Sequence, residues 1–435
     1  MINYFEKGVN IAYDSINRNE FLRRWAHVNS PSENEILIMF GIGTGMFIKH
    51  LLLHSACYGR IIVIEPSIDI YEEAIRDEEV LRCTESEKLD IIIDNISDKF
   101  VNNILYNKLS EQNGKSLKIA IYPNYNHLFA EEYKRFLDTV DEVCDMVSAA
   151  EIVDNRFSKV IKKNIRINTN RLKGSYSIAD FAAKVSKDIP VIIAASGPSL
   201  SKNIVYLKQA KGKSLIVGLD SSLPALLKED IIPDVYFSID PTKIAKHFED
   251  ERIKNIPAIA VLQSPEHVIK DGQKYFFIFN GDEEILSSLK EQKVNVTVVP
   301  PLGSVANTAF TLMNMIGFKT IIFVGQDLAY TDDKYHAENT VHNEKTFKQD
   351  TIIYLPGIDG EAVKSSREFR MYKSGFEKII EMFPEHTFID ATEGGAYIEG
   401  TKVKTLSDVV NEYCIQSFKI NEYFENIELL IKESI

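Results

Sequence analysis

The sequence predicts an α/β fold made of two Rossmann-like domains with mainly parallel sheets, followed by a short C-terminal helical segment. Two observations predict this class: apolar runs of strand length alternate with helical patterns, and the alternation occurs in two separate stretches of the 435-residue chain. A content of 45% hydrophobic and 26% charged residues is ordinary for a globular protein, and the length is enough for two or three domains.

The first predicted domain covers residues 1–165. Strands are expected at four places, over residues 35–40, 61–65, 89–93 and 117–122, with helical patterns between them. This alternation favours a parallel sheet, because parallel neighbours need a crossover connection that is usually a helix. From about residue 150 the pattern becomes polar and helical, until an apolar strand begins at Pro190.

The second predicted domain covers residues 166–404, and residues 405–435 form the C-terminal segment. Besides the strand at Pro190, strands are expected over residues 214–218, 234–239, 258–262, 294–298, 320–324 and 387–389. Most of these are followed by helical patterns, so this sheet is also expected to be mainly parallel. After Lys404, apolar residues recur at spacings of three and four, which predicts helix to the end of the chain.

Charge and cysteine usage exclude several classes of partner. The net charge is −13 and no block or stripe of Lys and Arg offsets it, so we expect neither nucleic acid nor a membrane surface as a partner. The four cysteines are scattered without metal-ligand spacing, which fits thiols in a reducing compartment; they are Cys57, Cys83, Cys144 and Cys414. The N-terminal residues carry charges and no apolar signal core, so a cytoplasmic location is expected.

A glycine-rich turn follows the first strand of the first domain. The segment Phe40 to Gly45 reads FGIGTG, and Glu65 ends the next strand, which is the layout that places an adenosine ribose against a carboxylate. The same glycines would also suit a tightly packed strand–helix junction. Since no later segment is suited to methyl-transfer chemistry, the architectural interpretation is favoured over a bound adenosine cofactor.

The most informative motif lies at the start of the second domain, where a strand runs into a glycine turn and a helix. Unpaired N–H groups in the first turn of a helix attract an anion. Gly197 lets the anion approach, Pro198 fixes the entry direction and Ser199 offers a hydroxyl. We therefore predict a nucleotide-phosphate cradle, with an ordinary strand–helix turn as the alternative; its residues are Ser196, Gly197, Pro198, Ser199 and Leu200.

Polar residues also follow three other strands of the second domain. Asp220 and Ser221 follow one strand, Asp240 the next and Asp327 a later one. Open α/β sheets bind ligands at the carboxyl ends of their strands, so these side chains are expected to face one crevice. The alternative for each aspartate is a helix or turn cap.

Two more segments are assigned to this crevice. Gly303, Ser304 and Asn307 begin a helix whose N-terminus could receive an anion such as a sugar carboxylate. A polar loop past Asp327 contains two tyrosines and a histidine, which are Tyr330, Tyr335 and His336. A histidine in such a loop is either a surface residue or a catalytic or substrate-binding one.

Five ordered motifs together resemble the motility accessory factor family. They read GPSLSKNI, GLDSSLPALLKEDIIPDVYFSIDP, PPLGSVANTAF, VGQDLAYTDDKYHAENT and DATEGGAYIEG. The resemblance is dense from about Asn170 to Lys404 and looser before it. It implies a glycosyltransferase, similar in its central domain to bacterial sialyltransferases, that transfers a nonulosonic acid from a CMP-activated donor to Ser or Thr of flagellin, with inversion at the anomeric centre. Many relatives have a longer C-terminal helical region, so acceptor recognition is the least supported implication.

This chemistry gives each candidate residue a role. The donors of the 196–200 motif are assigned to CMP, and Asp220, Ser221 and Asp240 to nucleotide or sugar hydroxyls. Gly303, Ser304 and Asn307 are assigned to the carboxylate and phosphate region. Asp327 or His336 is the expected base, and Tyr330 and Tyr335 are expected to hydrogen-bond the departing phosphate.

Metal dependence and two other functions stay open. The sialyltransferases that the chain resembles need no metal, so no cofactor is expected, although the acidic strand ends would also suit Mg²⁺. One alternative is a pterin pyrophosphokinase that uses ATP and Mg²⁺ held by Asp220, Asp240 and Asp327. The other is a non-catalytic flagellin-binding chaperone.

Overall fold

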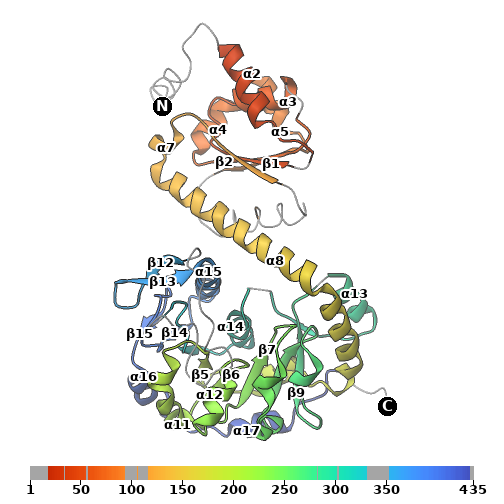
Figure 1. Cartoon of the computed structure of the whole chain (residues 1–435), viewed down its shortest axis with the longest axis vertical. Helices are drawn as coiled ribbons and strands as arrows, with labels where there is room; N and C mark the ends of the chain where they lie inside the picture. Colours follow the sequence, from red (N-terminus) through yellow and green to blue (C-terminus); the bar gives the residue numbers. More distant parts are fainter. Residues whose placement is uncertain are drawn as a thin grey trace. The chain divides into compact units, whose positions relative to one another are not determined.

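The computed structural model describes residues 18–33, 35–54, 57–93, 105, 116–281, 283–300, 303–330 and 352–431. The chain forms two compact units, residues 1–151 (unit 1) and residues 152–435 (unit 2), each with its own sheet (Figure 1). Helix α8, Ala130–Arg171, begins in unit 1 and ends in unit 2. The predicted α/β class with mainly parallel sheets is confirmed.

The sheet of unit 1 has four parallel strands in the order β3-β2-β1-β4. They are β1 Glu35–Phe40, β2 Arg60–Glu65, β3 Leu89–Ile93 and β4 Ser116–Ile121. The helices of this unit that the structure describes before α8 are α2 Arg18–Asn29, α3 Met46–His54, α4 Ile68–Ala74, α5 Glu78–Thr84 and α7 Tyr125–Leu128. Strands β1 and β2 are buried almost throughout, as expected for parallel strands with helices on both faces.

The main sheet of unit 2 has nine strands in the order β10-β9-β8-β7-β6-β5-β11-β14-β15, and all of its pairs are parallel. Six strands occupy predicted places: β5 Val191–Ala194, β6 Leu215–Leu219, β7 Val235–Ser238, β8 Ala258–Val261, β11 Thr320–Val324 and β14 Thr387–Asp390. Strand β10, Thr297–Val298, is shorter than predicted. Four strands were not predicted: β9 Tyr275–Phe279, β15 Lys402–Val403 and the antiparallel hairpin of β12 Ile352–Pro356 and β13 Ala362–Ser366.

Helices cover both faces of this sheet. Side chains of alternate strand residues, such as Ile192 and Ile193 of β5, enter two different hydrophobic clusters. One cluster contains residues of α9 Ile178–Lys184, α14 Val305–Ile316, α15 Arg367–Met382 and α17 Ile420–Glu425. The other contains residues of α10 Leu200–Asn203, α11 Leu207–Ala210, α12 Leu223–Lys228 and α16 Leu406–Tyr413. The described part of unit 2 also contains α13, Glu283–Glu291.

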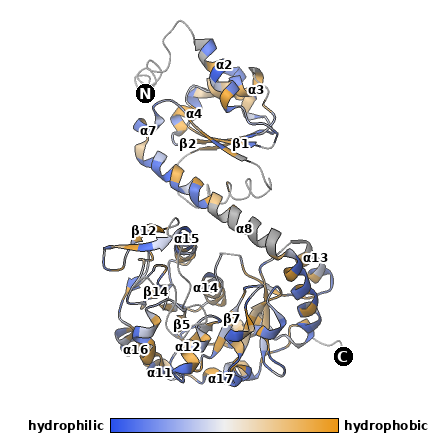
Figure 2. Ribbon diagram, in the orientation of Figure 1, coloured by the Kyte–Doolittle hydropathy of each residue, from blue (hydrophilic) through white to orange (hydrophobic). Residues whose placement is uncertain are grey.

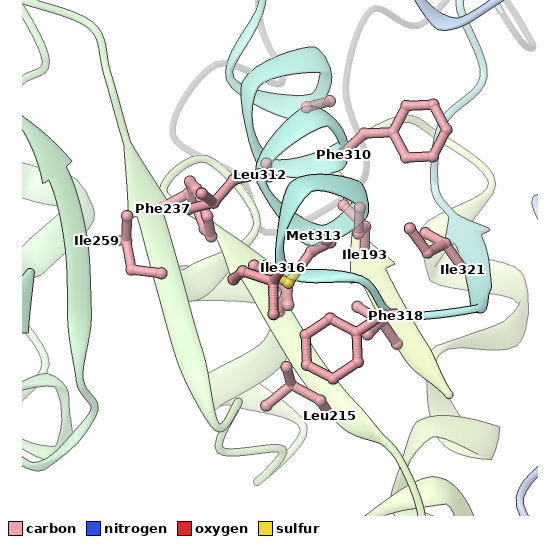
Figure 3. Close-up of a cluster of buried hydrophobic side chains, with 14 of the residues drawn as sticks. Ile193, Leu215, Phe237, Ile259, Phe310, Leu312, Met313, Ile316, Phe318 and Ile321 are labelled. Carbon is pink, nitrogen blue, oxygen red and sulfur yellow. The ribbon is translucent and has the colours of Figure 1, made fainter. Parts of the chain in front are cut away.

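Helix α14 is the centre of the first cluster. Figure 3 shows Leu312, Met313 and Ile316 facing the sheet residues around Phe237, and all four side chains are almost fully buried. The helix begins at its N-cap Ser304, whose hydroxyl accepts a hydrogen bond from the Asn307 N–H, and it ends at a left-handed glycine. After Lys404, helix is confirmed at α16 and α17, but residues 414–419 between them and residues 426–431 after α17 are not helical, so the prediction of helix to the end of the chain is wrong there.

The strand orders locate one switch point in each sheet. In unit 1 the chain moves from β1 outward to β2 and β3, and then returns to place β4 on the other side of β1. In unit 2 it moves from β5 to β10 on one side and places β11 on the other. Ligands of open α/β sheets bind outside the carboxyl ends of the strands at such a point. The ends of β5 and β11 are therefore where a site in unit 2 is expected.

Among the helices of the described ranges, none is long and apolar enough to cross a membrane.

Candidate functional site

The turn after β6 connects three strands through three consecutive side chains. The Ser222 hydroxyl donates to the carbonyl of Ala194 at the end of β5, with an O–O distance of 2.7 Å. The Ser221 hydroxyl lies 2.9 Å from that of Ser196, which also follows β5. This turn thus holds two hydroxyl groups, from neighbouring strand ends, side by side at the edge of the sheet.

The third side chain, Asp220, forms a buried ion pair. Its carboxylate is fully buried, accepts a hydrogen bond from the Ser238 hydroxyl at 2.8 Å and lies 2.8 Å from Lys243 Nζ. Burial raises the pKa of Asp220, while the lysine and the Ser238 hydroxyl lower it. Lys243 is also largely buried, so the pair holds its ammonium group against Asp220, the residue that precedes Ser221 in the β6 turn.

Asp240 caps its own turn. Its Oδ1 accepts from the Thr242 N–H at 2.7 Å and from the Thr242 hydroxyl at 2.8 Å. This is the turn-cap arrangement that was the alternative for each aspartate.

The glycine motif after β5 closes around Asp327. The Ser199 N–H donates to Asp327 Oδ1 at 3.1 Å, and the Ser199 hydroxyl donates to Oδ2 at 2.6 Å. A Cβ on Gly197 would lie 2.1 Å from the same carboxylate, so a glycine is required there. The predicted phosphate donors of Ser199 therefore bind a carboxylate of the protein itself, and a phosphate could use them only after Asp327 moved away.

The other members of the motif have packing roles. Pro198 and Leu200 are buried, and Leu200 belongs to the core cluster under α10. The Gly197 N–H donates to the Gly325 carbonyl at 2.8 Å and joins the ends of β5 and β11. Helix α10 is only four residues long, so its dipole is weaker than the sequence motif suggests.

A second buried aspartate lies beside this arrangement. Asp390 ends β14 and is 1% exposed, and its Oδ1 accepts from the Thr392 N–H at 3.0 Å. Burial raises the pKa of Asp390 to about 6, and the charge of Asp327 also raises it. The next residues of this turn approach Asp327 closely, because a Cβ on Gly395 would lie 2.1 Å from its carbonyl oxygen.

The start of α14 is also occupied by internal contacts. The Ser304 hydroxyl caps the helix, and the Asn307 side-chain amide donates to the Tyr372 carbonyl at 3.1 Å. Gly303 has a φ of +85°, and Met371 and Tyr372 of α15 lie against it. The assignment of these residues to a sugar carboxylate stays a prediction.

The loop beyond β11 is described only in part. Tyr330 packs its ring 5.6 Å from that of Phe369, measured between centroids, and its N–H donates to the Lys364 carbonyl. Tyr335 and His336 lie outside the described residues, so their predicted roles stay predictions. Within the described ranges, no three His, Cys, Asp or Glu side chains are grouped closely enough to hold a metal ion.

In unit 1, two tyrosines fill the space around the glycine-rich turn. A Cβ on Gly41 would lie 2.3 Å from the Tyr125 ring, and one on Gly43 would lie 2.1 Å from the Tyr122 ring. Glu65 is fully buried and accepts from the Ile42 N–H at 2.7 Å and from the Tyr125 hydroxyl at 3.0 Å. Burial raises the pKa of Glu65 to about 7, and these hydrogen bonds lower it. The ribose-binding layout is thus satisfied internally, which supports the architectural interpretation.

Two features of the site are absent from the sequence-based assignment. Lys243 supplies a largely buried cation beside Asp220. The sequence indicates this residue only by its position, two residues after the Asp240-Pro241 pair that follows a strand. The turn from Asp390 to Gly395 packs against Asp327, although in the sequence it appeared only as one of the family motifs.

Comparisons with known proteins match this architecture. Residues 163–333 match a family model described as 6-hydroxymethylpterin diphosphokinase MptE-like. The solved structure of a MAf glycosyltransferase from Magnetospirillum magneticum AMB-1 is similar, with a TM-score of 0.58 and 16% sequence identity. The alignment covers 93% of this chain and 65% of that protein, so the chain spans slightly less than two thirds of its length. No curated protein matches the sequence. At the level of fold, the chain is thus similar to the motility accessory factor family that its sequence motifs resemble, with an MptE-like segment at its centre.

Proposed function

We propose that unit 2 is a glycosyltransferase that transfers a nonulosonic acid from a CMP-activated donor to Ser or Thr hydroxyls of flagellin. The observation that carries the proposal is the group of hydroxyl and ammonium donors at the carboxyl edge of the sheet, in a fold similar to that of a MAf glycosyltransferase. The inverting course of the reaction and the cytoplasmic location belong to the same proposal.

The donor would bind at the ends of β5 to β7. The Ser196 and Ser221 hydroxyls and the Lys243 ammonium group are suited to the phosphate of CMP, because each can donate a hydrogen bond to an anionic oxygen. Asp220 orients the lysine and is neutralised by it. As the sugar–phosphate bond breaks, negative charge grows on the phosphate, and fixed donors stabilise that charge.

His336 and Asp327 remain the two candidates for the base that takes the proton of the acceptor hydroxyl. Asp327 already accepts hydrogen bonds from the backbone and hydroxyl of Ser199 and is 2% exposed. A carboxylate held in this way is better suited to fixing the ends of β5 and β11 than to meeting an acceptor. We therefore assign the base to His336 and a positioning role to Asp327.

The second candidate function is an ATP- and Mg²⁺-dependent pterin diphosphokinase, because the MptE-like family model covers the ends of β5 to β11. That function would require Asp220, Asp240 and Asp327 as metal ligands. Asp220 is paired with Lys243, and Asp327 binds Ser199, so two of the three carboxylates would first have to exchange their partners. This requirement favours the glycosyltransferase.

Two measurements test the proposal. Thermal unfolding with CMP, CTP, or ATP plus Mg²⁺ identifies the nucleotide, because a ligand of the folded state raises the melting temperature. We expect stabilisation by the cytidine nucleotides, whereas stabilisation by ATP and Mg²⁺ alone would favour the kinase. Intact-mass spectrometry of flagellin incubated with the enzyme and a CMP-nonulosonic acid then measures transfer.

Variants assign the residues in the same assay. The double variant Ser196→Ala/Ser221→Ala is expected to slow transfer by about 10²-fold, because it removes hydrogen-bond donors that would stabilise the charge growing on the phosphate in the transition state. The exposed Ser201→Ala is the matched control and should transfer at the normal rate. His336→Ala should abolish transfer without changing CMP binding. Full activity of both the double serine variant and His336→Ala would refute this site.

A further inference from the structure

The end of α8 that belongs to unit 2 has a row of exposed cations, which we call the α8 stripe. Its members are Lys159, Lys162, Lys163, Arg166 and Lys173, the last of which lies just past the end of the helix, and all five are exposed. At about 100° per residue, they fall within an arc of about 100° on the helix surface. Figure 2 shows this end of α8 with blue, hydrophilic residues. The stripe extends for about 20 Å along the helix axis.

The opposite side of the helix is fixed to unit 2. The Asn164 side-chain amide donates to the carbonyls of Pro241 and Gln263, at 3.0 and 2.7 Å. Asn168 donates to the carbonyls of Leu262 and Ser264, at 3.0 and 2.7 Å. These bonds and the buried Leu172 orient the helix, so the stripe is held facing away from the unit.

The charge of the α8 stripe is not neutralised within the described part of the chain. None of its five members has an ion-pair partner there, and no Asp or Glu occurs between residues 155 and 179. Like charges at helical spacings repel one another, so the stripe attracts an anionic partner. The sequence-based expectation that the chain has no basic stripe is wrong here, because these cations recur at spacings of three and four that bring them to one side of the helix.

We propose that the α8 stripe docks an acidic segment of a partner protein. Charge complementarity supports this occupant, since the stripe is basic within a chain of net charge −13. That overall charge repels a long polyanion such as DNA or an anionic bilayer, whereas a short acidic segment contacts the stripe alone. The stripe also lacks the exposed aromatic side chains that stack on bases and the apolar face that enters a bilayer. The inference does not depend on the proposed reaction.

The test uses the full chain and a fluorescein-labelled glutamate-rich peptide as the probe. Fluorescence anisotropy should show binding at low ionic strength that weakens steeply as NaCl is added. The quadruple variant Lys159→Glu/Lys162→Glu/Lys163→Glu/Arg166→Glu should bind the peptide at least tenfold more weakly. A glutamine-rich peptide of equal length should not bind.

A second quadruple variant controls for net charge. It reverses four exposed lysines elsewhere in unit 2, as Lys202→Glu/Lys208→Glu/Lys246→Glu/Lys290→Glu, and should bind the peptide as the unmodified chain does. Equal weakening in both variants would overturn the proposal, as would tighter binding of a short DNA duplex or of phosphatidylserine vesicles. A dimer in light scattering that only the stripe variant disrupts would also overturn it, because the stripe would then bind a second copy of the chain. The melting temperature of each variant confirms that it is folded.

Discussion

At the scale of single residues, Asp390 couples the fold of unit 2 to pH. Its pKa is raised from an ordinary value of 3.8 to about 6, mainly by burial and in smaller part by the charge of Asp327, while the hydrogen bonds of Thr392 lower it. Its Oδ1 accepts the Thr392 N–H, and its Oδ2 is buried with no hydrogen-bond partner among the described residues. The folded chain therefore holds the Asp390 proton more tightly than the unfolded chain does, and ionisation of this group weakens the fold.

We predict that the free energy of unfolding of unit 2 falls as pH rises from about 4 to about 6, by up to about 3 kcal/mol from this group. Asp390→Asn should remove this part of the pH dependence and make the protein more stable at pH values above the window, because the neutral amide has no charge to desolvate. Urea unfolding across the window measures the slope. Asp271→Asn, at an exposed position, is the control. An unchanged slope in Asp390→Asn would show that this carboxyl group does not titrate as described.

At the scale of elements, the glycine-rich turn of unit 1 shows how one loop can suit two purposes. The spacing from the β1 turn to Glu65 fits a ribose site. However, the rings of Tyr122 and Tyr125 fill the space beside the turn, and the Tyr125 hydroxyl donates a hydrogen bond to the Glu65 carboxylate. Glycine is required at position 43 for two reasons: its φ of +54° is unfavourable for other residues, and a Cβ there would overlap the Tyr122 ring.

We predict that Gly43→Ala destabilises unit 1 by about 2 kcal/mol or more, because the new methyl group overlaps the Tyr122 ring and the backbone angle is strained. Gly212→Ala is the matched control, since Gly212 also has a positive φ but no atom within 4 Å of its Cβ position. Thermal unfolding compares the two. Equal losses would mean that backbone strain alone accounts for the effect and that the tyrosine packing is not tight.

The same elements show what could be predicted from the sequence. Strands such as β1 and β11 were predicted because each is a short apolar run next to a turn signal. Strand β9 is an apolar run of the same kind, so the sequence contains the signal for it although it was not among the predicted strands. The hairpin of β12 and β13 was not predicted because its strands pair only with each other and are partly exposed. In the site, Ser199 and Asp327 were both predicted as functional residues, but the hydrogen bond between them was not predicted. The two residues are 128 positions apart in sequence, and they meet because β5 and β11 are neighbours in the sheet.

At the scale of the whole molecule, the two units have separate hydrophobic cores. The cluster of unit 1 contains residues from Leu22 to Val143, and the three clusters of unit 2 contain residues from Leu172 onward. Among the elements that the structure describes, helix α8 is the one that belongs to both units. A core that shares no side chains with its neighbour can unfold without it.

We predict that calorimetry of the full chain resolves two unfolding transitions rather than one. Gly43→Ala should lower only the transition of unit 1, whereas Asp390→Asn, above the pH window, should raise only that of unit 2. A cytidine nucleotide that binds at the ends of β5 to β7 should also raise only the transition of unit 2, because a ligand stabilises the unit whose folded form it binds. If both variants shift a single common transition, the units fold cooperatively, and a ligand of either unit would then stabilise the whole chain.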